Sequence, residues 1–169
     1  PFYRNDTSSI YTHDVSGTDD TAALNTAYGI TALDAITTGD NNTVVGSGAG
    51  GGLTTGHRNT LMGQGAGILL TEATHTVAIG NAAASGYDTE TNNIAIGHVA
   101  LGGSVNGGEY NVGVDNYTLD ALTSGDNNTA VGYEAGSALT SGANNVLLGY
   151  QSGAALTGSS NTFLGYKAG

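Results

Sequence analysis

Asn128-Thr-Ala-Val-Gly-Tyr-Glu-Ala-Gly136 decides the fold, because altered copies of this stretch recur along most of the 169-residue chain. Asn42-Thr-Val-Val-Gly46, Asn93-Ile-Ala-Ile-Gly97 and Asn161-Thr-Phe-Leu-Gly-Tyr-Lys-Ala-Gly169 are three of them. The central glycine returns every 17 residues, with one interval of 18 and one of 16. It occupies Gly29, Gly46, Gly63, Gly80, Gly97, Gly132, Gly149 and Gly165, and Asp115 stands in the remaining slot. A fixed short period predicts a solenoid, in which each coil contacts only its neighbours.

Other positions of the repeat are equally regular. The residue three before the glycine is β-branched, the residue one before it is apolar in nearly every unit, and the residue three after it is small. A larger apolar residue follows seven after the glycine, except near Ser104 and Val105, where the extra residue falls. An asparagine lies four before the glycine in every unit but one: Asn25, Asn42, Asn59, Asn93, Asn111, Asn128, Asn145 and Asn161, with Thr76 in the exceptional unit.

These columns predict an all-β solenoid of about nine stacked coils. Residues three and one before the glycine share one face of a strand, because strand side chains alternate with period two. The glycine suits a backbone kink with positive φ, or the close approach of another backbone. The asparagines predict a ladder of side-chain amides along the stack. We expect a second short strand and a turn in the other half of each coil.

The domain organisation follows from the extent of the repeat. We expect one repeat domain over residues 25–169, preceded by a connector or capping segment over residues 1–24. The chain has 29 glycines, no tryptophan, two phenylalanines and one methionine. A slim coil with small residues inside buries little surface by itself. We therefore expect burial to be shared between chains, most simply in a homotrimer of parallel rods, which removes exposed edges.

The charge excludes several kinds of partner. The formal net charge is −11, and only Arg4, Arg58 and Lys167 are positive. Binding to nucleic acid needs many cationic contacts, so nucleic acid and anionic membranes are not expected partners. The sequence shows no apolar run of transmembrane length and no signal peptide, so membrane insertion is not expected.

The repeat motifs quoted above, with Val77-Ala-Ile-Gly80, resemble the left-handed parallel β-roll repeats of trimeric autotransporter adhesin heads. They are still more similar to the Asn-Thr-Ala-Val-Gly-Tyr repeats of bacteriophage fibre and appendage proteins. The resemblance covers about six sevenths of the chain and implies a left-handed roll and a homotrimer. The adhesin repeats are usually shorter than 17 residues, which favours the phage proteins.

The first segment departs from the repeat. Gly17-Thr-Asp-Asp-Thr-Ala-Ala-Leu24 is similar to the start of pectate-lyase-like tailspikes, where an Asp-Asp-Thr cap begins a short helix. Asp20 or Thr21 is the helix N-cap that this resemblance implies. Because the repeat begins directly afterwards, a connector is favoured over a true tailspike domain.

Candidate contact residues are few. Tyr133, Tyr150 and Tyr166 form a column just after the glycine, and a tyrosine ring either stacks on a sugar or packs against the next coil. Turn residues Asp40 and Asp126, and Asp115 in the glycine slot, are the weak candidates for a cation site. Ordinary turn geometry is favoured for the two turn residues and a local defect for Asp115, so no metal and no cofactor are expected.

The sequence therefore predicts a structural and adhesive virion protein that is not an enzyme. It would be a segment of a phage tail fibre or appendage, joined to other virion proteins at its ends, that contacts host-surface glycans or acts as a pure spacer. The alternatives are a trimeric adhesin head on a bacterial surface and a short polysaccharide depolymerase.

Overall fold

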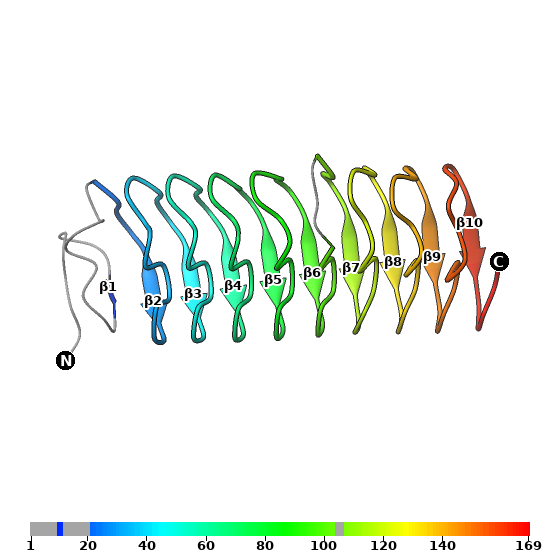
Figure 1. Cartoon of the computed structure of the whole chain (residues 1–169), viewed down its shortest axis with the longest axis horizontal. Helices are drawn as coiled ribbons and strands as arrows, with labels where there is room; N and C mark the ends of the chain where they lie inside the picture. Colours follow the sequence, from blue (N-terminus) through cyan, green and yellow to red (C-terminus); the bar gives the residue numbers. More distant parts are fainter. Residues whose placement is uncertain (1–9, 12–20, 104–106) are drawn as a thin grey trace.

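The computed structural model describes residues 10–11, 21–103 and 107–169, and these form one β-solenoid. Its single sheet has ten parallel strands in the order of the sequence, so each strand pairs with the next (Figure 1). The strands are β1 (Ile10–Tyr11), β2 (Thr26–Tyr28), β3 (Thr43–Val45), β4 (Thr60–Met62), β5 (Val77–Ile79), β6 (Ile94–Ile96), β7 (Val112–Val114), β8 (Thr129–Val131), β9 (Val146–Leu148) and β10 (Thr162–Leu164).

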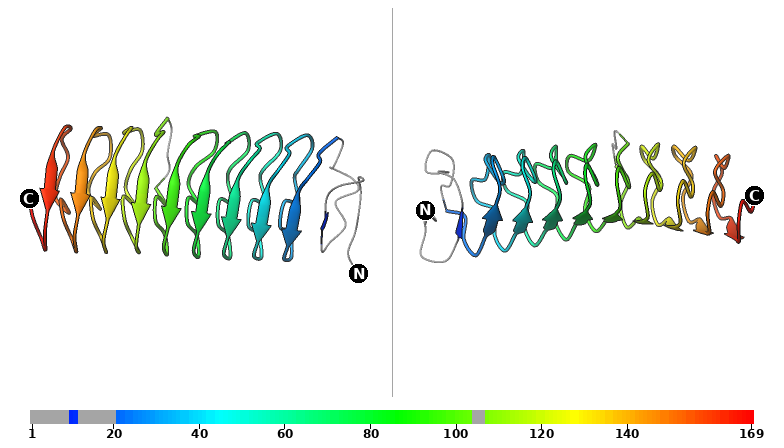
Figure 2. Two further views of the ribbon diagram at one scale, coloured as in Figure 1. Left: turned by 180° about the vertical axis from the view of Figure 1, so that it is seen from behind. Right: turned by 90° about the horizontal axis from the view of Figure 1, so that it is seen from below.

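Each coil contains one strand, the central glycine or Asp115, and a series of turns that leads back to the next strand. Figure 2 shows the strands side by side along one face of the rod, with the turns on the other. The chain runs down the near face of the left view and returns behind it while advancing to the left, which is a left-handed winding. The all-β, parallel solenoid expected from the 17-residue period is confirmed.

The strand register matches the columns of the sequence. Thr43 pairs with Thr60, Val44 with Leu61 and Val45 with Met62, and the other pairs follow the same rule. The middle residue of each strand points inward, and the first and third point outward. One period of the sequence therefore equals one coil, and each column stacks on itself.

The central glycines have the backbone that the sequence predicts. Their φ angles run from +125° at Gly165 to +144° at Gly29, a region that side chains rarely allow. A Cβ atom on Gly63 would lie 2.3 Å from the carbonyl oxygen of Gly80 in the next coil. Both expected reasons for glycine, the positive φ and the close approach of a second backbone, therefore apply together. Asp115 fits the slot with a smaller φ of 102°.

The expectation of a second strand in each coil is wrong. After the glycine the chain forms turns, because the residues two and four positions later adopt left-handed backbone. Thr31 and Leu33 in the first coil, and Val99 and Leu101 in the fifth, have φ angles of 50–56°. A strand needs extended residues in succession, so alternating left-handed residues cannot continue one. Hydrogen bonds between coils, such as Val99 N to Asn81 O at 3.0 Å, fix this path.

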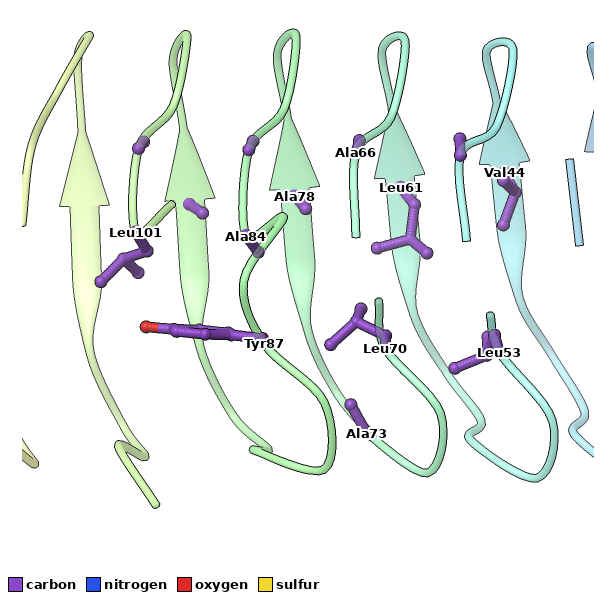
Figure 3. Close-up of a cluster of buried hydrophobic side chains, with 14 of the residues drawn as sticks. Val44, Leu53, Leu61, Ala66, Leu70, Ala73, Ala78, Ala84, Tyr87 and Leu101 are labelled. Atoms are coloured by element: carbon purple, nitrogen blue, oxygen red, sulfur yellow. The ribbon is translucent and has the colours of Figure 1, made fainter. Parts of the chain in front are cut away.

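The core is a narrow apolar strip inside the coils. Val44, Leu61 and Ala78 from the strands face Leu53 and Leu70 from the turns (Figure 3). Small residues such as Ala66 fill the remaining inward positions. The described coils thus bury their inward-facing side chains within the single chain. The large apolar side chains that stay exposed lie on the outside of the rod.

Tyr87 replaces the usual leucine at its position and is fully buried. Figure 3 shows its ring extending toward the coil that carries Leu101. The apolar position of that coil falls near Ser104 and Val105, which lie outside the described residues. The Tyr87 hydroxyl has no hydrogen-bond partner among the described residues, and burial, followed by the nearby Glu90 carboxylate, raises its pKa.

The asparagine side chains form the expected amide ladder inside the rod. Asn42 Nδ2 donates to Asn25 Oδ1 and Asn59 Nδ2 donates to Asn42 Oδ1, both at 3.0 Å. Each amide also donates to a carbonyl of its own coil, as Asn42 Nδ2 does to Gly56 O at 3.0 Å. The same pattern links Asn111, Asn128, Asn145 and Asn161. The hydrogen bonds of these buried asparagine side chains are therefore made within and between neighbouring coils.

Thr76 interrupts this ladder. Its backbone N–H still donates to Asn59 Oδ1 at 2.9 Å, but its buried hydroxyl has no partner within the described part of the chain. Thr76 also has no amide to donate to Asn59 or to accept from Asn93 in the next coil. The fourth coil therefore contains a weak point in the hydrogen-bond ladder.

Replacing Thr76 with asparagine is expected to raise the free energy of unfolding by about 1–2 kcal/mol, since it restores two or three buried hydrogen bonds. Thermal or denaturant unfolding measures the change. The exposed substitution Asn81→Thr removes an amide bonded to Gln64 on the surface and is expected to change stability by no more than about 0.5 kcal/mol. Loss of stability in Thr76→Asn would show that the site cannot hold the larger amide.

The segment before the repeat contributes to the sheet. Ile10 and Tyr11 of β1 pair in parallel with Thr26 and Ala27, and Tyr11 is fully buried. Thr21 begins no helix in the described residues, and Asp20, the other N-cap expected from the tailspike resemblance, lies outside them. The role of residues 1–24 as a connector or cap stays a prediction.

Candidate interaction surface

The outward-facing side chains of β2 to β10 form a continuous surface that we call the outer sheet face. It consists of the first and third residue of each strand, and none of these residues is charged. The exposed large apolar residues on it are Tyr28, Met62, Ile79, Val131, Val146 and Leu164. Figure 2 shows that the strands bearing them lie in one row along the rod.

This surface differs from the rest of a chain that carries 14 acidic residues and a net charge of −11. The described acidic side chains lie in the turns or in the glycine slot, none of them on the strands. The outer sheet face combines exposed apolar side chains with the threonines that begin β2, β3, β4, β8 and β10, and exposed apolar side chains gathered on one face mark a candidate interaction site. The outer sheet face is thus the candidate site with the longest continuous extent.

Aromatic side chains form a second feature, the aromatic column, which comprises His98, Tyr117, Tyr133, Tyr150 and Tyr166. The centroids of consecutive rings lie 5.2, 5.9, 5.5 and 5.3 Å apart. His98 and Tyr117 meet their neighbours edge to face, whereas the last three rings are nearly parallel, with 11° between adjacent planes. The structure thus brings the three predicted tyrosines together and adds two residues that the sequence argument missed.

The stacking limits how the tyrosines can contact a sugar. A sugar ring held between two aromatic faces would need a gap of about 7 Å, twice an ordinary van der Waals contact. The measured 5.5 and 5.3 Å leave no such gap. Glycan contact stays a prediction, and it would use ring edges, hydroxyl groups and the outer face of Tyr166, whose residue is 73% exposed.

Polar side chains lie beside the tyrosines in the next column of the repeat. Gln151 Nε2 donates to Glu134 Oε2 at 2.5 Å, and the Lys167 Nζ lies 5.4 Å from the centroid of the Tyr166 ring. The pKa of Tyr133 is raised by its hydrogen bond to Glu134, and then by the negative charge of that carboxylate. The end of the rod near β10 therefore combines aromatic and polar groups on one edge.

The three aspartates considered for a cation each accept a hydrogen bond from the backbone. Asp40 Oδ1 accepts from Ala23 N at 2.7 Å, and Asp126 Oδ1 accepts from Glu109 N at 2.9 Å. Asp115 Oδ1 accepts from Asn116 N at 2.8 Å. Asp40 and Asp126 thus link neighbouring coils, as turn residues of a solenoid do. No group of three or more metal-ligating side chains occurs in the described ranges.

Two further carboxyl groups are partly or fully buried. Glu90 accepts from the backbone N–H groups of Asp88, Thr89 and Gly107, at 2.8, 3.1 and 2.8 Å, and so joins two coils beside the one-residue insertion. Burial raises the pKa of Asp120. A hydrogen bond from its own backbone lowers the pKa in part, and the negative charge of Glu134 raises it further. Neither Glu90 nor Asp120 was a candidate from the sequence, because a single acidic residue in a turn does not recur in the repeat and so gives no sign that it is buried.

Comparison with protein-family models, curated proteins and solved structures gives no match. The described part of the chain contains no helix of the length and apolar character that a membrane span requires.

Proposed function

We propose that this protein is a structural segment of a phage fibre or appendage, in which three copies associate in parallel through their outer sheet faces. The observation that carries the proposal is the uncharged surface of apolar and threonine side chains that runs along β2 to β10. A chain with a charge of −11 repels its copies, so a surface free of acidic groups is where they can meet.

The parallel sheet suits this arrangement because every coil presents the same outward pair of side chains. Copies that run in the same direction can align coil with coil, and cyclic closure covers the whole surface. Three copies, rather than two, follow from the resemblance to β-roll fibres and adhesin heads. The mechanism is mechanical extension, with weak contacts repeated on each chain and strengthened by avidity.

Replacing Ile79 with lysine tests the surface. Ile79 is 36% exposed near the middle of the outer sheet face, and a lysine there would place three like charges close together in the trimer. We expect Ile79→Lys to reduce the solution mass from three chains to one while leaving the circular dichroism spectrum unchanged. Multi-angle light scattering measures the mass.

Ile68→Lys is the matched control, because Ile68 is 39% exposed but lies in the turns. We expect this variant to stay trimeric. A trimeric Ile79→Lys, or equal loss of mass in both variants, would contradict association through the outer sheet face.

The virion location needs a separate test. An antibody raised against the purified rod is expected to label fibres or appendages of phage particles in electron micrographs of the source sample. Labelling of bacterial surfaces would instead favour the trimeric adhesin head.

A further inference from the structure

The last two tyrosines of the aromatic column form the most accessible close pair of rings in it. Tyr150 is 43% exposed and Tyr166 is 73% exposed. Their ring centroids lie 5.3 Å apart and their planes differ by 11°. Two rings lying side by side in one plane could not bring their centroids this close. The nearly parallel rings are therefore stacked one over the other with an offset.

The backbone holds the two rings in this register. Lys167 N donates to Tyr150 O at 2.8 Å, directly beside the pair, and Gly165 N donates to Leu148 O at 2.8 Å on the other side. Leu148 and Leu164 are themselves paired residues of β9 and β10. The rings are therefore neighbours because the coils stack, and their proximity does not depend on a chance encounter of flexible side chains.

We propose that Tyr150 and Tyr166 are a site of oxidative cross-linking, at which a one-electron oxidant joins the two rings as an intramolecular dityrosine. Each phenol gives one electron to the oxidant and its hydroxyl proton to water. The two phenoxyl radicals then form a carbon–carbon bond between their ortho carbons. The hydrogen on each of these carbons moves to the phenolic oxygen, so the product has lost two electrons and two protons overall.

The bond would be a covalent link between the last two described coils. It closes a short loop of the chain between residues 150 and 166, and a cross-link of this kind restricts the unfolded state. The proposal rests on the geometry of this pair and is independent of the proposed trimer and of any glycan contact.

The test uses the intact chain at low concentration with a photogenerated one-electron oxidant, followed by cleavage after glutamate. Residues 135–169 contain no glutamate and have Tyr150 and Tyr166 as their only tyrosines. An intramolecular bond therefore appears as the loss of two hydrogens from this single fragment, together with dityrosine fluorescence. We expect its yield to fall at least about tenfold in urea, where the rings are no longer held together.

Two variants complete the design. Tyr166→Phe keeps a stacked ring but cannot form a phenoxyl radical, so we expect it to abolish the product. Tyr110→Phe removes another exposed tyrosine, outside the aromatic column, and is expected to leave the product unchanged. Dityrosine found only in covalent dimers, or formed equally well in urea, would overturn the proposal.

Discussion

Gly63→Ala is expected to lower the free energy of unfolding by about 3–5 kcal/mol, because the change combines two costs. Gly63 has a φ of +135°, which an alanine adopts only with strain. Its new Cβ would also lie 2.3 Å from the Gly80 carbonyl oxygen. The backbone of both residues is hydrogen-bonded and cannot easily move to relieve this contact. Denaturant unfolding followed by circular dichroism measures the loss.

Gly65→Ala is the matched control in the same coil. Gly65 has a φ of +66°, and no heavy atom lies within 4 Å of the position of an added Cβ. Alanine, valine, glutamate and lysine all occupy the equivalent position in other coils. We expect a cost of about 1 kcal/mol or less. Equal losses in the two variants would show that the close contact between coils at Gly63 has no energetic weight.

Asn128→Ala is expected to cost about 3–5 kcal/mol, since it removes four buried hydrogen bonds of the amide ladder at once. Asn128 Nδ2 donates to Asn111 Oδ1 at 3.0 Å and to Gly142 O at 2.9 Å. Its Oδ1 accepts from the backbone N–H of Asn145 at 3.1 Å and from Asn145 Nδ2 at 2.9 Å. After truncation the Gly142 carbonyl and the Asn145 N–H would lose these partners.

Asn81→Ala provides the comparison, because Asn81 also donates across coils, to Gln64, but is exposed. Water replaces that hydrogen bond, and we expect a change of about 0.5 kcal/mol or less. The denaturant m-value should be followed in all variants, since a solenoid can lose part of its coils without unfolding completely. A loss below 1 kcal/mol in Asn128→Ala would mean that the ladder is dispensable.

The period and the glycine column were enough to predict the solenoid, because a positive φ and the close approach of the next coil both require glycine at this one spacing. The left-handed residues after the glycine could not be predicted. Leu33, Val99 and Glu134 occupy them, although such side chains disfavour this backbone, and the hydrogen bonds between coils override that preference. The second expected strand was wrong for the same reason.

The candidate surfaces were predictable only in part. The apolar columns of the repeat were visible, but alternation alone does not say which face of a strand points inward, and the outer sheet face appeared only in the structure. Tyr117 was missed because it lies at the second position after Asp115, whereas the three predicted tyrosines lie at the first position after the glycine. The stacking of the aromatic rings also depends on side-chain orientation, which sequence spacing does not give.

The solution mass of the unmodified chain tests the central claim most directly. Light scattering at several concentrations is expected to give three times the 16.7 kDa mass of one chain, with the outer sheet faces buried between copies. A folded monomer at every concentration would contradict the account, because the exposed apolar side chains of the outer sheet face would then meet water along the whole rod.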